Sequence, residues 1–360
     1  RLEVFENGTV LEISIAGWED FPGVHSLEPT MRVLDTDVYL PYLESTRRIW
    51  VQLPEGYHDS TMDYPVLYLQ DGQNVFNSAT SFVGEWEVDE TMNALDPECP
   101  QSIVVGVDNG GAERINEYSP WVHPDYGGGN GHLYAQDLVE VIKPLIDSTL
   151  RTLPQREFTG VGGSSLGGLI SLYLLLEHQD VFSKGLIASP SLWFSEGIYE
   201  TAQNTMPLSD TKFYFFGGTS ESSTMVSNME AMLEVLTDQG FNQEQMTLVT
   251  HDDGAHSEWY WAREYEDAYK WLHNDIPSSL TTQNLAPSIG PIPTFGSIRI
   301  QLWDEEIVQV TVWGLDQQLL GVLHSRPGQK NFDLSNIPNG VCILQIQTKR
   351  HNYYQRIIKE

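Results

Sequence analysis

The sequence predicts an α/β fold, with a mostly parallel central sheet covered by helices on both faces, followed by a small all-β sandwich. Three observations predict it. Apolar strand-like and helical segments alternate through most of the chain, a Pro/Ser/Thr-rich stretch follows, and the tail alternates apolar and polar residues with period two. We therefore expect a large domain over residues 1–276, a linker over 277–293 and a β-sandwich over 294–360.

The first strands of the large domain fall into two groups. Three segments look like edge strands of an initial all-strand region: Val10–Ile15, Asp37–Leu40 and Arg48–Leu53. Two later segments, Pro65–Gln70 and Ser102–Val107, are continuous apolar runs. Such runs are typical of central strands that are covered on both faces.

Helices and strands alternate along the rest of the large domain. The segment Leu133–Leu150 carries Leu138, Ile142, Leu145 and Ile146 at helical spacing. The elements that follow are strand Glu157–Val161, helix Leu166–Glu177, strands Lys184–Ala188 and Lys212–Phe216, helix Met225–Leu236, strand Gln245–Thr250 and helix Ser257–Leu272. Alternation of this kind implies a parallel sheet with right-handed crossovers, which is the plan of an α/β-hydrolase fold.

The tail shows strand periodicity instead. Its alternating apolar positions are Ile298, Ile300 and Leu302, then Val308, Val310 and Val312, then Val341, Ile343, Leu344 and Ile346. Turn signals separate these runs, at Arg326-Pro327-Gly328 and Pro338-Asn339-Gly340. We therefore predict a β-sandwich of about seven strands.

The charge distribution excludes some classes of function. The 360 residues carry 19 basic and 50 acidic side chains, a net charge of −31. Residues 294–360 hold 7 basic and 6 acidic side chains, which leaves 12 and 44 for residues 1–293. Binding to nucleic acid or to an anionic membrane needs positive patches, so this acidity argues against both. We interpret it as a charged surface that favours solubility and suits a salty or extracellular setting.

Other bulk features carry less information. No run of 18 apolar residues exists, so we expect no membrane span. The chain begins with Arg1 and no signal-like apolar segment follows, which we interpret as a processed or trimmed chain. We expect Cys99 and Cys342 to lie in different domains as buried free thiols, so cysteine usage decides little about the compartment.

The most informative segment is Gly163-Ser164-Ser165-Leu166-Gly167, which fits the pattern G-x-S-x-G. A predicted strand precedes it and a predicted helix follows it, as the pattern requires. A serine at such a turn exposes its hydroxyl above the sheet edge, and the start of the helix points backbone N–H groups at the same place. We therefore predict that Ser165 is a nucleophile, the alternative being a glycine-rich turn of purely structural use.

A serine nucleophile needs a base, which we assign to His256. In α/β-hydrolases the order along the chain is serine, acid, histidine, and the histidine lies on a loop after the last central strand. His256 fits this position, whereas His251 abuts the end of the predicted strand. His251, Asp252, Asp253 and His256 could in principle bind a metal, but no fixed ligand spacing is matched. We expect neither a metal nor a cofactor.

The acid that orients the histidine is expected after strand Lys212–Phe216. The loop Gly217-Gly218-Thr219-Ser220-Glu221 follows this strand, so we choose Glu221, although a glutamate there also suits a helix N-terminus. Asp210 precedes the strand and lies at its wrong end. Asp252 or Asp253, from the histidine loop, stays open as an alternative.

Two backbone N–H groups are expected to bind the developing oxyanion. One belongs to Leu166, the residue after the nucleophile, and the other to the loop that follows strand Pro65–Gln70, where we choose Gln73. Gly72 is expected to let this loop turn tightly. We expect Asp71 to brace the loop rather than to take part in chemistry.

These residues carry a resemblance to a known family. The segments are Pro65–Asn74, Gly106-Val107-Asp108-Asn109, Gly162–Gly168, Gly217–Glu221 and Gly254-Ala255-His256-Ser257-Glu258. They resemble the esterase-D-like "putative esterase" branch of the α/β-hydrolases, which includes feruloyl, acetyl-xylan and enterochelin esterases. The resemblance covers roughly Asp37–His273 and implies hydrolysis of carboxylic esters by Ser165, His256 and an acid at Glu221. The loop Asp108–Trp121, with Arg114, Glu117 and Tyr118, also looks like a family segment, for substrate framing or for bracing.

The tail is similar to the sorting domain of type IX secretion in Bacteroidetes. The similarity rests on Phe295–Ile300 at its start, Asn336–Val341 near its end and Ile357-Ile358-Lys359 at its close. It implies an exported enzyme, either secreted or at the cell surface, that uses the secretion machinery as a partner.

The leading hypothesis is therefore a secreted serine esterase that acts on short-chain or carbohydrate-linked acyl esters. Candidates for lining the substrate cleft are Trp86, Arg114, Tyr118, Trp121 and Trp193, although each aromatic is more often part of a core. No long apolar lid segment is evident, which favours small soluble esters over triglycerides. The alternatives are acyl transfer or peptide hydrolysis on the same triad, and a non-catalytic adhesion or carbohydrate-binding protein that keeps the fold.

Overall fold

The computed structural model describes most of the chain. It covers residues 2–6, 9–13, 30–82, 84–96, 99–208, 210–276, 288–290, 297–301, 307–314, 318–326, 329, 331–348 and 352–359. The chain divides into two compact units, Arg1–Ser278 and Ser279–Glu360, which are described one after the other.

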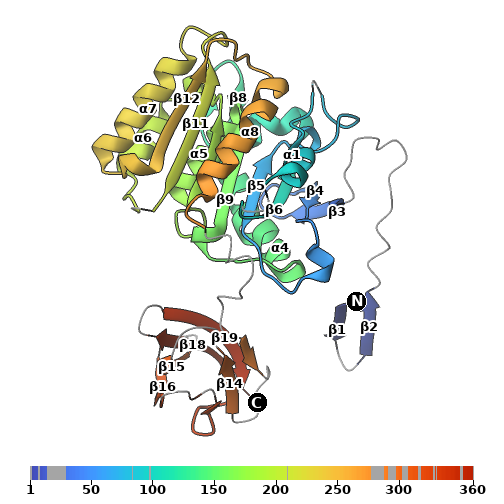
Figure 1. The fold of residues 1–360 in the computed structure, drawn as a ribbon, viewed down its shortest axis with the longest axis vertical. Coiled ribbons are helices and arrows are strands. Elements are labelled where there is room, and N and C mark those ends of the chain that lie inside the picture. The colour runs from blue at the N-terminus through green and yellow to red at the C-terminus, as the bar shows by residue number, and fades with distance from the viewer. Residues whose placement is uncertain are drawn as a thin grey trace. The chain divides into compact units, whose positions relative to one another are not determined.

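The larger unit contains an eight-stranded sheet of order β12-β11-β10-β9-β5-β6-β4-β3 (Figure 1). Its strands are β3 (Met31–Leu40), β4 (Ser45–Gln52), β5 (Val66–Gln70), β6 (Ile103–Val107), β9 (Thr159–Ser164), β10 (Lys184–Ala188), β11 (Lys212–Gly218) and β12 (Met246–His251). All neighbours from β12 to β6 pair in parallel, and β4 and β3 continue the sheet antiparallel. The predicted mostly parallel sheet is confirmed.

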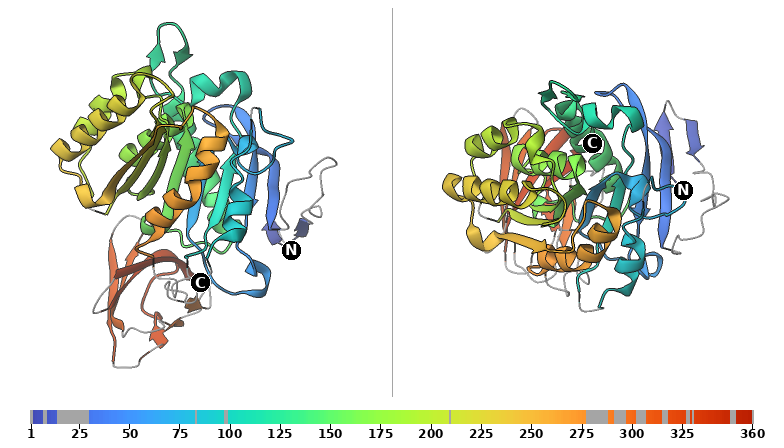
Figure 2. Two further views of the ribbon diagram at one scale, coloured as in Figure 1. Left: turned by 45° about the horizontal axis from the view of Figure 1, so that its top comes forward. Right: turned by 90° about the horizontal axis from the view of Figure 1, so that it is seen from above.

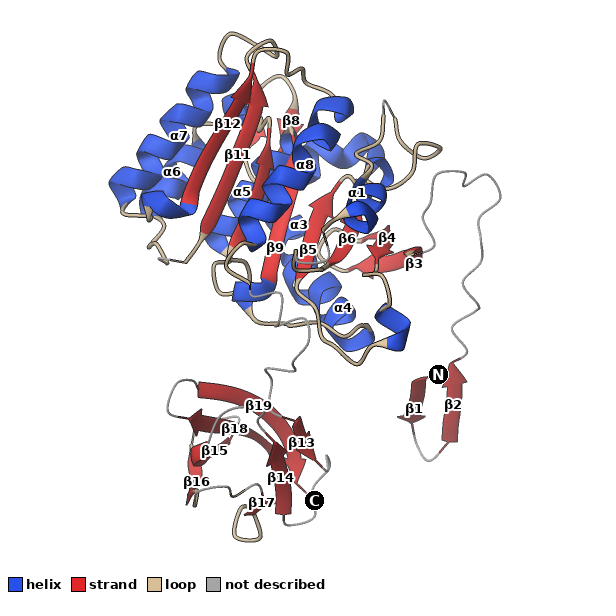
Figure 3. Ribbon diagram, in the orientation of Figure 1, coloured by secondary structure: helices blue, strands red, loops and turns tan. Residues whose placement is uncertain are grey.

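Helices cover both faces of this sheet (Figure 3). One face packs against α3 (Gly131–Asp137), α4 (Lys143–Thr149), α5 (Leu166–Glu177), α6 (Gly197–Asn204) and α7 (Met225–Gln239). The other packs against α1 (Val88–Ala94) and α8 (Glu258–His273). The two views of Figure 2 show the sheet between these layers. The carboxyl ends of the parallel strands therefore meet at one edge, where ligands bind in folds of this class.

Shorter elements complete the larger unit. They are α2 (Arg114–Glu117), the 3₁₀ turns η1 (Tyr57–Asp59), η2 (Gly72–Asn74), η3 (Gly111–Glu113), η5 (Arg156–Phe158), η6 (Leu192–Phe194) and η7 (Gln243–Gln245), and the π-helical turn η4 (Leu138–Ile142). The π turn joins α3 to α4, so the single helix predicted over Leu133–Leu150 is a composite one. Two strand pairs lie outside the main sheet, β1 (Leu2–Glu6) with β2 (Thr9–Ile13) and β7 (Val122–His123) with β8 (Gly127–Gly128).

Several predicted boundaries were wrong for identifiable reasons. The strand predicted over Glu157–Val161 is β9, which begins at Thr159 because Arg156–Phe158 form a 3₁₀ turn. Strand β11 continues through Gly218, where its neighbour β12 still pairs with it. The segment predicted as edge strand Arg48–Leu53 is β4, which lies between β6 and β3 and is not an edge. The predicted strand Val10–Ile15 corresponds to β2, which pairs only with β1 among the described residues.

The smaller unit is all β. A three-stranded sheet contains β13 (Ser288–Gly290), β14 (Ser297–Gln301) and β17 (Asn331–Asp333), and a four-stranded sheet contains β16 (Leu319–His324), β15 (Ile307–Gly314), β18 (Gly340–Thr348) and β19 (Asn352–Lys359). Buried side chains of both sheets, among them Ile300, Val310 and Leu344, form one core. The described strands thus confirm the predicted sandwich, and β13 lies within the predicted linker.

One predicted core position of this unit is corrected. Val308 is exposed and Ile307 is buried, because the register of β15 against β18 shifts between Ile307 and Gln309 and so inverts the alternation there. Leu302 lies outside the described residues.

Two bulk expectations can be compared with the described residues. Within these ranges no helix has both the length and the apolar character that crossing a membrane requires. Both cysteines are free thiols, but Cys99 is half-buried rather than buried, whereas Cys342 is buried.

Candidate active site

Ser165 lies on a strained turn between strand β9 and helix α5. Its backbone angles, φ 59° and ψ −122°, are costly for a residue with a side chain, on the order of 1–3 kcal/mol. Hydrogen bonds hold the turn: the Ser165 N–H donates to the Ala188 carbonyl, and the Ser191 N–H donates to the Ser165 carbonyl, both at 3.0 Å. A Cβ at Gly163 would lie 2.9 Å from Gln70 of β5, so the turn also needs a glycine there. Strain of this kind, maintained by its surroundings, is typical of functional sites.

His256 and Glu221 form a directly bonded pair. The Nδ1 atom of His256 lies 2.7 Å from Oε2 of Glu221. Glu221 comes from the loop after β11 and has a side chain 1% exposed, whereas His256 comes from the loop after β12 and is 39% exposed. Because Nδ1 is engaged by the carboxylate, Nε2 is the nitrogen left for proton exchange.

A second set of contacts holds Glu221. Its Oε1 atom accepts hydrogen bonds from the Ser189 hydroxyl at 2.7 Å and from the Gly218 N–H at 2.6 Å. The Trp261 indole N–H donates to the same Ser189 hydroxyl at 2.9 Å, and its ring meets the His256 ring edge to face at 5.2 Å. Both carboxylate oxygens of Glu221 therefore have donors, which fixes the side chain behind the imidazole.

The sequence reasoning missed Ser189 and Trp261. Ser189 follows strand β10 directly, with a positive φ of 41°, and Trp261 lies one turn into α8. Position after a parallel strand could have suggested Ser189, since that is where β9 also delivers Ser165. Nothing in the local pattern distinguishes Trp261 from the other aromatic residues of α8.

The Ser165 hydroxyl does not reach His256 directly in this structure. It lies 3.3 Å from the Ser191 hydroxyl, and among the described residues no hydrogen bond joins it to the imidazole. Ser165 and His256 nevertheless line the same cavity. In unliganded enzymes catalytic hydrogen bonds are often long and tighten only when substrate binds, so this geometry is compatible with a serine–histidine pair.

The predicted oxyanion donors come from two different elements. Leu166 is the first residue of α5, where a backbone N–H has no partner within the helix. Gln73 lies in η2, directly after β5, and lines the same cavity as Ser165. The left-handed turn of this loop falls on Asp71, with φ 58°, and not on Gly72. Gly72 is required instead by close packing, because a Cβ there would lie 2.7 Å from the backbone of Gly106.

Asp71 connects the loop after β5 to the segment that follows β6. Its carboxylate accepts two hydrogen bonds from Arg114, at 2.6 and 2.8 Å, and one from the Asn109 amide at 2.6 Å. Its backbone N–H donates to the Tyr118 hydroxyl at 3.1 Å. Two charges paired in this bidentate way give a rigid link. Arg114 therefore braces the loop and also faces the cavity.

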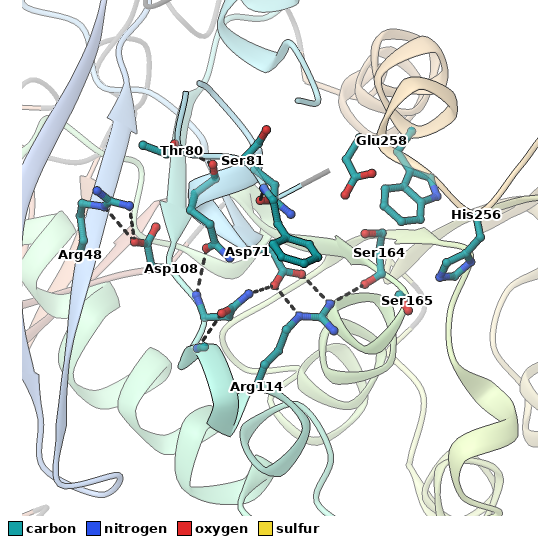
Figure 4. Close-up of a pocket in the computed structure, with 16 residues that line it drawn as sticks. Arg48, Asp71, Thr80, Ser81, Asp108, Arg114, Ser164, Ser165, His256 and Glu258 are labelled. Carbon is teal, nitrogen blue, oxygen red and sulfur yellow. Dashed lines mark hydrogen bonds and ion pairs between the residues drawn. The ribbon is translucent and has the colours of Figure 1, made fainter. Parts of the chain in front are cut away.

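The cavity has a volume of about 780 Å³, and most of the residues that line it have polar or charged side chains. Figure 4 shows Arg48 and Asp108 at one end and Ser165 and His256 at the other. The Arg48 guanidinium lies 2.8 Å from the Asp108 carboxylate. Burial raises the pKa of Asp108, and the Arg48 charge opposes that shift. Glu258, in the first turn of α8, contributes a further carboxyl group to the wall, and burial raises its pKa as well.

The aromatic candidates divide into two kinds. Trp86, Tyr118 and Trp121 do not line this cavity: Trp86 and Tyr118 are buried, and Trp121 packs against Tyr173. Their prediction as cleft residues was wrong, since each fills space within or between the helical layers. Trp193 lines a different cavity, of about 330 Å³, on which His256 also borders.

The remaining acidic candidates point elsewhere. Asp253 pairs with Arg263 at 2.7 Å, and this hydrogen bond lowers its pKa. The Asp252 carboxylate accepts from the Thr219 hydroxyl at 3.4 Å, and His251 lies 3.5 Å from Glu264. Within the described ranges, ligand-type side chains close enough to share a cation gather away from this loop, at Glu85, Asp89 and Glu90.

The chain is similar to known proteins over its larger unit. Residues 41–274 match the family described as "Putative esterase". The uncharacterized protein YbbA of Bacillus subtilis is 26% identical over 253 residues, covering 65% of this chain and 95% of YbbA. Endo-1,4-beta-xylanase Y of Acetivibrio thermocellus is 24% identical over 212 residues, covering 54% of this chain and 18% of that protein. The crystal structure of an IroE-like serine hydrolase from Shewanella oneidensis superposes with a TM-score of 0.54 at 22% identity, over 67% of this chain and 79% of that one.

Proposed function

Because the chain belongs to the "Putative esterase" family, we propose that it is a serine carboxylesterase with a triad of Ser165, His256 and Glu221. The observation that carries the proposal is the 2.7 Å contact between His256 Nδ1 and the buried Glu221 carboxylate, placed beside the strained Ser165 turn. A carboxylate that orients an imidazole next to a serine is the arrangement that activates a hydroxyl as a nucleophile.

The geometry supports a two-step hydrolysis. The Ser165 Oγ attacks the ester carbonyl carbon while His256 Nε2 accepts the hydroxyl proton, and the carbonyl oxygen becomes an oxyanion that the Leu166 and Gln73 N–H groups bind. Collapse of this intermediate breaks the bond to the alcohol oxygen, which takes the proton from His256. Water then attacks the acyl-serine with His256 as base, and the acid and free Ser165 are released.

The polarity of the larger cavity supports short or polar substrates. Its walls carry the ion pairs of Arg48 with Asp108 and of Arg114 with Asp71, together with Glu258. A long alkyl chain would desolvate these groups without giving them a partner, which costs free energy. We therefore propose short-chain or carbohydrate-linked acyl esters as the substrate class.

We also propose that the enzyme is exported, to the cell surface or the medium, and that the C-terminal sandwich serves as a sorting domain. The strong acidity of residues 1–293 suits such a setting. Expression in a type IX-secreting bacterium tests this: deleting 294–360 should retain the enzyme inside the cell, and unchanged export would contradict the proposal.

The activity itself is tested by substitution of the triad. Ser165→Ala and His256→Ala should each abolish hydrolysis of nitrophenyl acetate and butyrate while the thermal unfolding curve stays unchanged. Ser148→Ala, at an exposed helical serine, is the matched control and should retain full activity. Wild-type protein that hydrolyses none of these esters, nor acetylated xylan or methyl ferulate, would refute the proposal.

A further inference from the structure

A second cavity borders the catalytic histidine. It has a volume of about 330 Å³, and its walls include Trp193, Ser222, Asn228 and His256. Within the described part of the chain, His256 alone lines both this cavity and the larger one described above. The imidazole therefore borders two cavities, one lined by several charged groups and one lined by Trp193, Met225 and small polar side chains together with Glu221.

Trp193 of the second cavity belongs to a cluster of aromatic rings. Trp193, on η6, is 54% exposed, and Tyr126, at the tip of the β7–β8 hairpin, is 55% exposed. Their rings lie 5.8 Å apart, and His123 contacts both, at 5.9 and 4.8 Å. The buried Phe194 packs against His123 and Trp193 and so anchors the group. We call Trp193, Tyr126 and His123 the aromatic platform; the hairpin that carries two of them projects from the larger unit (Figure 2, left view, teal).

Such a platform requires an explanation, because contiguous exposed apolar patches on a protein surface often mark binding sites. Single exposed aromatics are common, but here three rings from two separate segments meet beside a proposed catalytic group. Their fixed mutual contacts also mean that little side-chain entropy is lost when a ligand binds.

We propose that the second cavity and the aromatic platform bind the alcohol half of the ester, and that this alcohol is a sugar ring. The inference rests on the proposed function. The acyl carbonyl must lie between Ser165 and the Gln73 N–H, and both of these residues line the larger cavity. The leaving oxygen must lie next to His256, which protonates it. His256 borders both cavities, and the larger one takes the acyl group, so we place the group attached to that oxygen in the second cavity.

The lining of the second cavity favours a pyranose over a plain alkyl or aryl group. The C–H face of a sugar ring carries slight positive charge and packs on the negative face of an indole or phenol ring. Its hydroxyl groups need hydrogen-bond partners, which Ser222, Thr224 and Asn228 offer at the rim. Apolar faces with a few placed polar groups are how proteins bind such amphipathic ligands.

The test compares two acetate esters that share the acyl group. The quantity measured is the ratio of kcat/KM on an acetylated xylo-oligosaccharide to kcat/KM on methyl acetate. Trp193→Ala should lower this ratio about tenfold, because it removes one aromatic stacking partner of the sugar ring. Tyr126→Ala should lower the ratio by a smaller factor. Trp259→Ala is the matched control, because Trp259 is 50% exposed on α8 and lines neither cavity; it should leave the ratio unchanged.

A binding measurement separates this inference from the proposed function. Full-length Ser165→Ala protein should bind unacetylated xylotetraose in calorimetry, and adding Trp193→Ala should abolish the binding. If wild-type protein hydrolyses methyl acetate but Trp193→Ala leaves the ratio unchanged, the inference fails and the esterase proposal stands. If no ester is hydrolysed, the esterase proposal fails, while xylotetraose binding still tests the platform. If Trp193→Ala lowers the rate on phenyl acetate and not on the sugar ester, the sugar assignment is overturned.

Discussion

The substitution Glu221→Gln probes the acid of the proposed triad. Two donors, the Ser189 hydroxyl and the Gly218 N–H, point at Oε1, so a glutamine must place its carbonyl oxygen there. Its NH₂ group then faces Nδ1 of His256 and donates to it. The imidazole is driven into the tautomer that carries its proton on Nε2, which cannot accept a proton from Ser165.

The size of the expected loss in rate also follows from the lost negative charge of Glu221. The imidazolium that forms during attack would sit about 4 Å, centre to centre, from the Glu221 carboxylate, an attraction of about 4 kcal/mol at an effective dielectric constant near 20. This corresponds to about a thousandfold in rate. We therefore expect kcat/KM to fall by about 10²–10⁴.

The assay is hydrolysis of nitrophenyl acetate, with thermal unfolding measured in parallel. Asp252→Asn and Asp253→Asn are the controls. The Asp253 carboxylate pairs with Arg263, the Asp252 carboxylate accepts a hydrogen bond from the Thr219 hydroxyl at 3.4 Å, and among the described residues no hydrogen bond joins either carboxylate to His256. Both should retain wild-type activity. If Glu221→Gln stayed within about threefold of wild type while either aspartate variant lost activity, the acid would be misplaced.

Three further results are expected. Gly72→Ala should lower stability by about 1–3 kcal/mol and reduce kcat, since its Cβ would press on the backbone of β6 at 2.7 Å; an unchanged urea midpoint and rate would contradict this. Burial, together with the Lys184 charge, lowers the pKa of His273 from 6.5 to about 3. Between these two pH values the unfolded state binds a proton at His273 that the folded state does not, so the free energy of unfolding falls as the pH drops from 6.5 towards 3. The loss is about 2 kcal/mol by pH 5, and His273→Gln should remove that part of the pH dependence, whereas an identical slope in both proteins would refute it. Deleting residues 285–360 should leave ester hydrolysis measurable, because the cavities described here are lined by residues of the larger unit; complete loss with intact folding would show otherwise.

The sequence predicted the elements whose signal is local. Strand β10 and helix α5 were placed to the residue; α5 is buried over most of its length and is therefore a nearly continuous apolar run. The loops after β11 and β12 were located by their order along the chain, and Glu221 and His256 do meet across them. Parallel strands deliver their carboxyl ends to one edge, so chain order alone brings such loops together.

The features of the fold and the site that depend on long-range packing could not be predicted from the sequence. Trp86 and Tyr118 are residue types that often line clefts, yet both are buried. No spacing rule shows whether a single aromatic side chain faces the core or a cleft. The hydrogen bonds from Trp261 through Ser189 to Glu221 join three segments 32–72 residues apart, and the local sequence does not encode them. The inverted alternation at Val308 arises from a register shift between two strands, which neither strand shows by itself.

The most direct test of the central claim is covalent labelling of the proposed nucleophile. Wild-type protein incubated with a small fluorophosphonate should gain one adduct, mapped by peptide mass spectrometry to Ser165, with activity lost in proportion to labelling. The same reaction should be slowed strongly in His256→Ala. An adduct at another residue, or inactivation with Ser165 unmodified, would contradict the account.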